Sequence, residues 1–337
     1  MKAAVIGAGR MGRRHMEVVR SLGLELVGIA DRSADNLDLA GSEASVPPER
    51  RFLETQRLMD LHPEVVVVAT TAPSHLPYAR LAAESGARYL LCEKPLATSL
   101  SDCDAILATC VKTGTRLAVN HQMRFMEQYR LTRDLLMSDV IGGLSSVTVI
   151  AGNFGMAMNG THYFEMFRYM AGEAALDATA WFSPDSIPNP RGAEFQDRSG
   201  SIRLTTASGK RFYLDVGADQ GHGIQAVYAG PCGQIVIDEL AGTLRMTHRR
   251  REDRGLATTR YGMPAEITNQ AIKPADAVTP TRDVLEALLG EKDHPTGAEG
   301  RLAVATLVAG YVSNETGHRP VRIEDAALPL DRQFPWA

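Results

Sequence analysis

A glycine-rich turn directly after the first strand constrains the fold more than any other feature of this sequence. The apolar run Ala3 to Ile6 leads into Gly7-Ala8-Gly9-Arg10-Met11-Gly12, and a helical pattern follows to Ser21. The first glycine permits a tight turn, the second lets a pyrophosphate approach the backbone, and the third allows close helix-strand packing. The free N–H groups of the helix start favour an anion. The pattern predicts a dinucleotide site formed by Gly7, Gly9, Arg10, Met11 and Gly12.

Asp31 follows the second predicted strand, Leu24 to Ala30, and lies 19 residues after Gly12. An aspartate there can accept hydrogen bonds from the adenosine ribose hydroxyls and repels a 2′-phosphate, which favours NAD over NADP. Arg32 keeps NADP open, because a guanidinium can stack on adenine or pair with that phosphate. We therefore expect NAD, with NADP as the alternative, and both side chains as cofactor contacts.

Strand and helix patterns alternate over the first 120 residues. Val65 to Thr70 and Tyr89 to Cys92 are continuous apolar runs, and helical patterns at His75 to Ser85 and Ser101 to Thr113 follow them. Continuous apolar runs with intervening helices are typical of a parallel sheet covered on both faces. Residues 1–120 are thus predicted to form a Rossmann dinucleotide-binding domain in an α/β fold.

The remaining residues, 121–337, have a different pattern. Short alternating runs between Ser199 and Thr247 predict an antiparallel meander with one apolar face, and helices are expected at 282–289 and 298–316. This part is predicted to be an α+β domain with an open, largely antiparallel sheet. Its apolar sheet face suggests that the chain forms oligomers.

Composition argues against several classes of function. The 337 residues carry 36 Lys and Arg against 40 Asp and Glu, a net charge of -4. The only dense basic run, His248 to Arg251, suits a solvated hairpin end, so we expect no nucleic-acid partner. No apolar stretch approaches the roughly 20 residues that cross a bilayer, and the N-terminus does not resemble a signal peptide. Without C-x-x-C or metal spacing, the cysteines predict no metal site and a cytoplasmic setting: Cys92, Cys103, Cys110 and Cys232.

The tripeptide Glu93-Lys94-Pro95 ends another predicted strand, where ligands gather in open α/β sheets. A lysine there can hydrogen-bond a substrate hydroxyl and stabilise the developing alkoxide. A surface Glu-Lys pair at the start of a helix explains the tripeptide equally well. Pro95 restricts the local backbone and is compatible with a cis peptide bond.

Together with the glycine turn and Glu-Lys-Pro, three further stretches resemble the Gfo/Idh/MocA family, named for glucose-fructose oxidoreductase and inositol dehydrogenase. They are Thr70 to His75, Gly160 to Glu165 and Tyr311 to Val321, so the resemblance covers nearly the whole chain. It implies NAD(P)-dependent hydride transfer to or from a carbinol carbon of a sugar, cyclitol or related polyol. It also implies a homodimer or homotetramer that associates through the open sheet.

The resemblance also implies roles for single residues. Lys94 matches the lysine that contacts the reacting hydroxyl, and His162 matches the proton acceptor in oxidation, so these two are the catalytic candidates. His75 suits a hydrogen bond at the helix start better than catalysis. The predicted cofactor contacts near these strand ends are Thr70, Thr71, Pro73, His75, Glu93 and Lys94.

Two positions depart from the family pattern. Met158 stands where many relatives carry an aspartate that orients the histidine, so we expect His162 to be a weaker base. Glu165 is a possible substitute, although a structural carboxylate fits it better. Gln122 stands where asparagine is usual. The candidate substrate contacts are His121, Gln122, Asn153, Asn159 and His162.

Two other functions remain open. A redox-neutral glycosidase or lyase would keep NAD bound and oxidise its substrate only transiently. A non-catalytic sensor would bind the dinucleotide and a partner protein, and the loss of the aspartate at Met158 favours this alternative. The presence of Lys94 and His162 argues against it.

Overall fold

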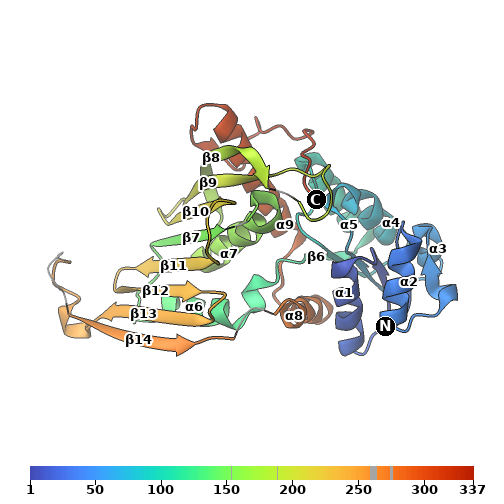
Figure 1. Cartoon of the computed structure of the whole chain (residues 1–337), viewed down its shortest axis with the longest axis horizontal. Helices are drawn as coiled ribbons and strands as arrows, with labels where there is room; N and C mark the ends of the chain where they lie inside the picture. The colour runs from blue at the N-terminus through green and yellow to red at the C-terminus, as the bar shows by residue number, and fades with distance from the viewer. Residues whose placement is uncertain (153, 188, 259–263, 274–275) are drawn as a thin grey trace. The chain divides into compact units, whose positions relative to one another are not determined.

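The computed structural model describes residues 1–337 except 153, 188, 259–263 and 274–275 (Figure 1). The chain forms two compact units. Met1–Phe125, Asp276–Val304 and Pro329–Ala337 make up the first, and Met126–Ala275 with Ala305–Leu328 make up the second. The sequence predicts a single boundary after residue 120, whereas the chain returns to the first unit twice.

The first unit contains a parallel sheet in the order β3-β2-β1-β4-β5-β6. The order reverses between β1 and β4, so a ligand crevice is expected at the carboxyl ends of these strands. The strands are β1 Lys2–Ile6, β2 Glu25–Ala30, β3 Arg51–Phe52, β4 Val65–Val68, β5 Tyr89–Cys92 and β6 Arg116–Val119. The helices are α1 Arg10–Ser21, α2 Ala34–Glu43, α3 Thr55–Met59, α4 His75–Glu84, α5 Leu100–Thr113 and α8 Val278–Leu289, with short 3-10 turns η1 Pro48–Arg50, η2 Ala72–Ser74 and η3 Gln122–Phe125.

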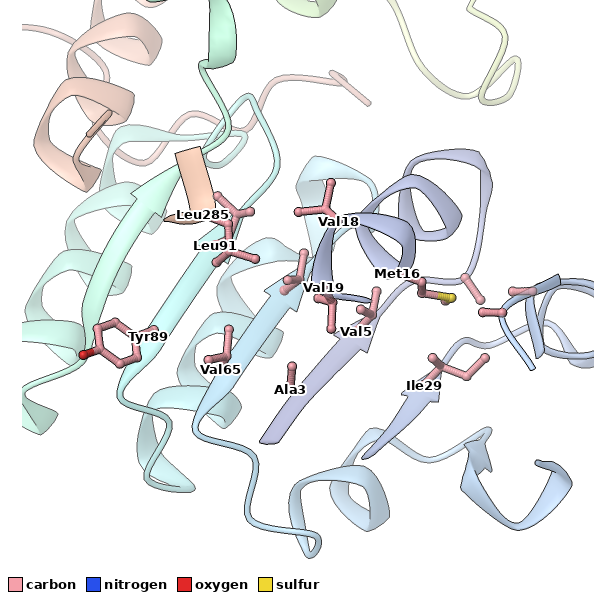
Figure 2. Close-up of a cluster of buried hydrophobic side chains, with 14 of the residues drawn as sticks. Ala3, Val5, Met16, Val18, Val19, Ile29, Val65, Tyr89, Leu91 and Leu285 are labelled. Carbon is pink, nitrogen blue, oxygen red and sulfur yellow. The ribbon is translucent and has the colours of Figure 1, made fainter. Parts of the chain in front are cut away.

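Figure 2 shows why α8 belongs to the first unit. Ala3 and Val5 of β1 point to one face of the sheet, where Val19 of α1 and Leu285 of α8 pack with them in one buried cluster. α4 packs with α3 and α5 elsewhere in this unit. An apolar stripe identifies a helix that must be covered, but it does not identify the sheet that covers it. A prediction made in chain order therefore assigns residues 278–289 to the second domain.

The second unit contains the sheet β14-β13-β12-β11-β7-β10-β9-β8-β15. Neighbouring strands are antiparallel, except that β7 and β10 are parallel. The strands are β7 Ser146–Gly152, β8 Ala175–Ile187, β9 Asp197–Thr206, β10 Arg211–Gly217, β11 Gln225–Gly230, β12 Gly233–Asp238, β13 Thr243–Arg249, β14 Ala265–Ala271 and β15 Val321–Arg322. The helical segments are α6 Glu127–Met137, a π-helical turn η4 Met156–Gly160, α7 Thr161–Ala171, a 3-10 turn η5 Arg251–Asp253 and the C-terminal part of α9 Gly297–Glu315.

The predicted fold class, a Rossmann-type α/β domain with a second, largely antiparallel sheet, is confirmed. The predicted simple meander is wrong in one detail, because β7 inserts between β11 and β10. Hydrophobic alternation shows which face of a strand is buried but not which strand lies beside it. Among the described residues, no helix has the length and apolar character needed to cross a membrane.

Candidate functional site

Steric contacts make two glycines of the turn after β1 necessary. Gly7 has a φ of +95°, and a Cβ there would lie 2.7 Å from the Ala69 carbonyl carbon. A Cβ at Gly12 would lie 1.8 Å from the Gly7 carbonyl oxygen. Any side chain at either position would therefore displace the turn or the first turn of α1. The predicted roles of both glycines in the tight bend and close packing agree with this geometry.

Gly9 differs, because no other described atom lies within 4 Å of the place where its Cβ would be. It caps the start of α1 without a side-chain hydrogen bond, and the first turn of the helix has no acidic residue. The helix start therefore offers N–H donors beside open space, which suits the pyrophosphate of a dinucleotide. The exposed Arg10 follows and lines a cavity of about 740 Å³ along α1, which Arg13 and Arg14 also line. Met11 lies half-buried beside it.

Asp31 links the end of β2 to the glycine turn. Its carboxylate accepts a hydrogen bond from the Ala8 backbone N–H at 2.6 Å and another from the Ser33 N–H at 2.8 Å. The side chain is half-buried, and the neighbouring Arg32 is exposed. Asn36 Nδ2 also approaches both oxygens, but only at 3.4 and 3.5 Å. Because a carboxylate has about four acceptor positions and these two bonds are long, ribose hydroxyls could replace Asn36 as donors to Asp31.

The segment after β4 contains Thr70, Thr71, Pro73 and His75. The His75 imidazole is buried, with Nδ1 lying 3.0 Å from the Pro95 carbonyl oxygen and Nε2 lying 3.1 Å from the Thr70 carbonyl oxygen. Burial lowers the pKa of His75, and the carbonyl contacts only partly oppose this effect. The histidine therefore joins the ends of β4 and β5, which fits the predicted hydrogen bonder at the start of a helix.

Glu93 and Lys94 are both buried at the end of β5, and the Lys94–Pro95 peptide bond is cis. Glu93 Oε1 accepts hydrogen bonds from His15 Nε2 at 2.7 Å and from Asn120 Nδ2 at 2.9 Å. Burial raises the pKa of Glu93, but the bond and charge of His15, with the charge of Lys94 and the bond from Asn120, outweigh it and hold the pKa well below its usual range. A surface Glu-Lys pair is thus excluded. No local sequence pattern identifies His15 or Asn120 as partners of Glu93.

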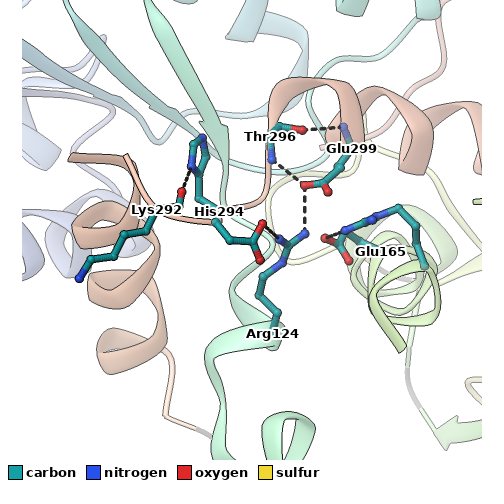
Figure 3. Close-up of polar contacts among 8 residues, drawn as sticks. Arg124, Glu165, Lys292, His294, Thr296 and Glu299 are labelled. Carbon is teal, nitrogen blue, oxygen red and sulfur yellow. Dashed lines mark hydrogen bonds and ion pairs between the residues drawn. The ribbon is translucent and has the colours of Figure 1, made fainter. Parts of the chain in front are cut away.

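His121 and Gln122 follow β6, where η3 begins. Gln122 Oε1 is buried and has no hydrogen-bond partner among the described residues, so it can accept a donor from a ligand. Arg124 holds this turn in place through Glu299, at 3.0 Å, and Asp293 (Figure 3). Sequence reasoning did not assign this anchoring role to Arg124.

His162 lies in the second unit, as the second residue of α7, and is half-buried. Met158 and Asn159 lie in the π-helical turn before it. Asp197, at the start of β9, accepts hydrogen bonds from the Ala157 and Met158 backbone N–H groups, each at 2.8 Å. This carboxylate therefore anchors the segment that leads into His162. Asn153, another predicted substrate contact, lies outside the described residues.

Glu165 pairs with Arg168 at 3.2 Å, one turn further along α7 (Figure 3). An ion pair within one helix is typical of a structural carboxylate. This geometry supports the structural alternative for Glu165 over a substitute for the missing aspartate. The expectation that Met158 makes His162 a weaker base is unaffected by this ion pair.

Comparisons with known proteins agree with these features. Residues 1–121 match the model of an oxidoreductase family with an NAD-binding Rossmann fold, GFO_IDH_MocA. The chain is 26% identical to D-apiose dehydrogenase of Paraburkholderia graminis, over 94% of this chain and 88% of that one. It is 27% identical to inositol 2-dehydrogenase 2 of Saccharopolyspora erythraea, over 93% and 90%. In fold, it is similar to an Agrobacterium radiobacter oxidoreductase solved with NAD+, L-tartaric acid and magnesium, with a TM-score of 0.80, 21% identity and coverage of 96% and 98%.

Proposed function

We propose that this chain is an oxidoreductase of the Gfo/Idh/MocA family, whose NAD-binding Rossmann-fold model matches residues 1–121, and that it transfers hydride between a nicotinamide dinucleotide and a carbinol carbon of a sugar or cyclitol. The curated relatives named after D-apiose and inositol support this substrate class. Their dehydrogenase names also favour net oxidation or reduction over a redox-neutral reaction.

One observation carries the proposal: the glycine turn, the Thr70 segment and Lys94 follow β1, β4 and β5, which are neighbours in one parallel sheet. The carboxyl ends of parallel strands meet at one edge, so a dinucleotide held at Gly9 would extend toward the lysine. A nicotinamide dinucleotide bound there would supply the hydride acceptor for the carbinol carbon. The protein must orient the substrate and manage the hydroxyl proton.

Lys94 hydrogen-bonds the reacting oxygen and stabilises the negative charge that develops there. By its match to the family motif, His162 is the candidate acceptor of the hydroxyl proton in the direction of oxidation. The acceptor Oε1 of Gln122 suits a further substrate hydroxyl, because it is buried and has no partner among the described residues. His121, Asn153 and Asn159 complete the proposed substrate contacts.

The first test combines binding with turnover. NADH fluorescence should change saturably on titration, and NAD or NADP should be reduced, as read at 340 nm, with one class of polyol, aldose or uronic acid. Lys94→Ala should lower turnover by a factor of about a hundred or more while the protein still binds NADH. Lys112→Ala, on the exposed face of α5, is the matched control.

Unchanged turnover in Lys94→Ala would remove this lysine from the mechanism. If NADH binds but no polyol is oxidised, the redox-neutral and sensor alternatives replace the dehydrogenase. Product formation from a glycoside with only catalytic NAD would then identify the former.

NAD is the proposed cofactor because Asp31 is fixed by the Ala8 N–H beside the glycine turn. Its carboxylate would repel a 2′-phosphate, so NADH should bind more tightly than NADPH. Asp31→Ala should reduce the difference between the two dissociation constants. An unaltered ratio would assign the choice to another residue.

A homodimer or homotetramer through the open sheet of the second unit completes the proposal. Tyr213 and Trp181 expose aromatic surface on β10 and β8. Light scattering after size exclusion should give a dimer or tetramer mass, and a monomer would contradict this part. The free thiols suit a reducing compartment, so we place the enzyme in the cytoplasm.

A further inference from the structure

His15 of α1 and Glu93 at the end of β5 form a buried pair beside Lys94. His15 has no exposed surface, Glu93 has 3%, and the distance from His15 Nε2 to Glu93 Oε1 is 2.7 Å. α1 begins at the glycine turn, and Glu93 directly precedes the lysine. The pair therefore connects the proposed dinucleotide-binding helix to the proposed catalytic lysine.

Both carboxylate oxygens of Glu93 are held. Asn120 Nδ2 donates to Oε1 at 2.9 Å, and the Lys94 backbone N–H donates to Oε2 at 3.3 Å. Asn120 is itself 3.3 Å from Thr281 Oγ1 of α8. A carboxylate with donors on both oxygens has one favoured orientation, so the charge beside Lys94 has a defined position.

We propose that Glu93 and His15 are positioning residues that act through Lys94: the oriented carboxylate favours the ammonium form of the neighbouring lysine, and the imidazole holds the carboxylate. The proposal rests on the proposed function, in which Lys94 donates a hydrogen bond to the reacting oxygen. Neither residue needs to touch the substrate for this role.

The charges around Glu93 favour this role. The titratable groups that act on it or feel it are His15 from α1, Lys94, His75 from the start of α4 and Cys92 from β5. Burial lowers the pKa of His75 and raises that of Cys92, so both are neutral near pH 7. Attraction to Lys94 helps to lower the pKa of Glu93, and by reciprocity the same attraction favours the ammonium form of Lys94. An ammonium is a stronger donor to an alkoxide than a neutral amine.

The test measures the protonation of Lys94 without any substrate. The full-length protein is treated briefly with acetic anhydride over a series of neutral to alkaline pH values, and acetylation of Lys94 is quantified by mass spectrometry. Glu93→Gln should lower the pH of half-maximal labelling by about one unit or more. His15→Leu removes a donor from the Glu93 carboxylate and should also shift the pH of half-maximal labelling, and His15→Gln, whose amide can donate to Glu93, should restore it toward the wild-type value.

His294→Leu is the matched control. This imidazole is also buried in the first unit, where its Nδ1 contacts the Lys292 carbonyl oxygen at 2.7 Å (Figure 3). Its removal should leave the labelling of Lys94 unchanged. Circular dichroism establishes that each variant is folded.

An unchanged labelling profile in Glu93→Gln would overturn the proposal and leave Glu93 a structural carboxylate. A shift in Glu93→Gln with none in His15→Leu would overturn the part played by His15. If His15→Leu does not fold, a wild-type labelling profile in His15→Gln together with a shifted profile in Glu93→Gln supports the proposal. A wild-type labelling profile in both variants overturns it. Failure of the proposed function shows separately, as the absence of NADH formation by the wild-type protein.

Discussion

Each compact unit buries a glutamate, and the two carboxyl groups are shifted in opposite directions. In the first unit, burial raises the pKa of Glu93, but His15, Lys94 and Asn120 outweigh burial and hold this pKa below the usual range. Glu239 in the second unit, directly after β12, is 8% exposed. Its donors are two phenols: Tyr129 makes a short hydrogen bond, and Tyr163 donates at 3.1 Å.

Burial raises the pKa of Glu239, and the bonds from the tyrosines lower it too little to reverse the shift. The two glutamates are similarly buried, so the chemistry of their hydrogen-bond donors decides which way each pKa shifts. Neutral hydroxyls hold a carboxyl that resists ionisation, whereas an imidazole and an ammonium hold a carboxylate. The first unit thus keeps a negative charge beside the proposed catalytic lysine, and the second uses its carboxyl to join α6 and α7 to the sheet.

The largest expected effect is the loss of the imidazole from the first pair. His15→Leu should cost about 3 kcal/mol or more of unfolding free energy, because it leaves a buried carboxylate with fewer donors. The chain has two tryptophans, Trp336 in the first unit and Trp181 in the second. Urea unfolding in a Trp181→Phe background therefore reports on the first unit through Trp336. A loss of less than about 1 kcal/mol would show that His15 contributes little to holding Glu93.

The same conservative substitution in both units sharpens the comparison. Glu93→Gln should cost about 2 kcal/mol, since the amide cannot accept charge-assisted bonds on both atoms. Glu239→Gln should cost less, about 1 kcal/mol, because the raised pKa of Glu239 shows that its surroundings favour the ionised form less than those of Glu93 do. Urea unfolding in the Trp181→Phe and Trp336→Phe backgrounds reads the two units. Equal costs would contradict the difference in charge state.

The sequence predicted what local patterns encode. Gly7, Gly12 and Asp31 lie in one strand-turn-helix-strand segment, and their geometry follows from the order of the residues. Lys94 was located by a short motif at a strand end. Local patterns could not predict the hydrogen-bond partners around Lys94, because His15 and Glu93 are 78 positions apart and Asn120 and Thr281 are 161 apart.

A single sequence carries no mark of such pairings, because any buried polar residue has many possible partners. The same limit explains why a prediction in chain order places α8 in the second domain and why it does not expect β7 beside β10. It also explains why the phenols around Glu239 were missed, since each of the three residues looks unremarkable within its own helix or strand.

The pH dependence of stability should have opposite signs in the two units. The pKa of Glu93 lies below the ordinary glutamate value of 4.5, so its stabilisation is present above about pH 4.5 and is lost as the pH falls through the lowered pKa. The pKa of Glu239 lies above that value, so its stabilisation is present below about pH 4.5 and is lost as the pH rises through the raised pKa. Urea midpoints of the two single-tryptophan variants, measured over acidic to neutral pH, should move apart. Glu93→Gln and Glu239→Gln should each flatten the profile of its own unit, and parallel profiles in wild type and variants would contradict both assignments.

The smallest effect is expected for Tyr163→Phe, which removes one of the two phenol donors and keeps the ring. It should cost about 0.5 kcal/mol in the second unit, the lower end of the worth of one hydrogen bond, because Tyr129 still donates to Glu239. The hydroxyl bonds lower the pKa of Glu239, so the loss of one should raise it further and extend the decline in stability to higher pH. Urea unfolding followed through Trp181 in the Trp336→Phe background measures both quantities. A cost without any change in the pH profile would mean that Tyr163 packs against Glu239 without governing its protonation, and the second unit would then hold its carboxyl through Tyr129 alone.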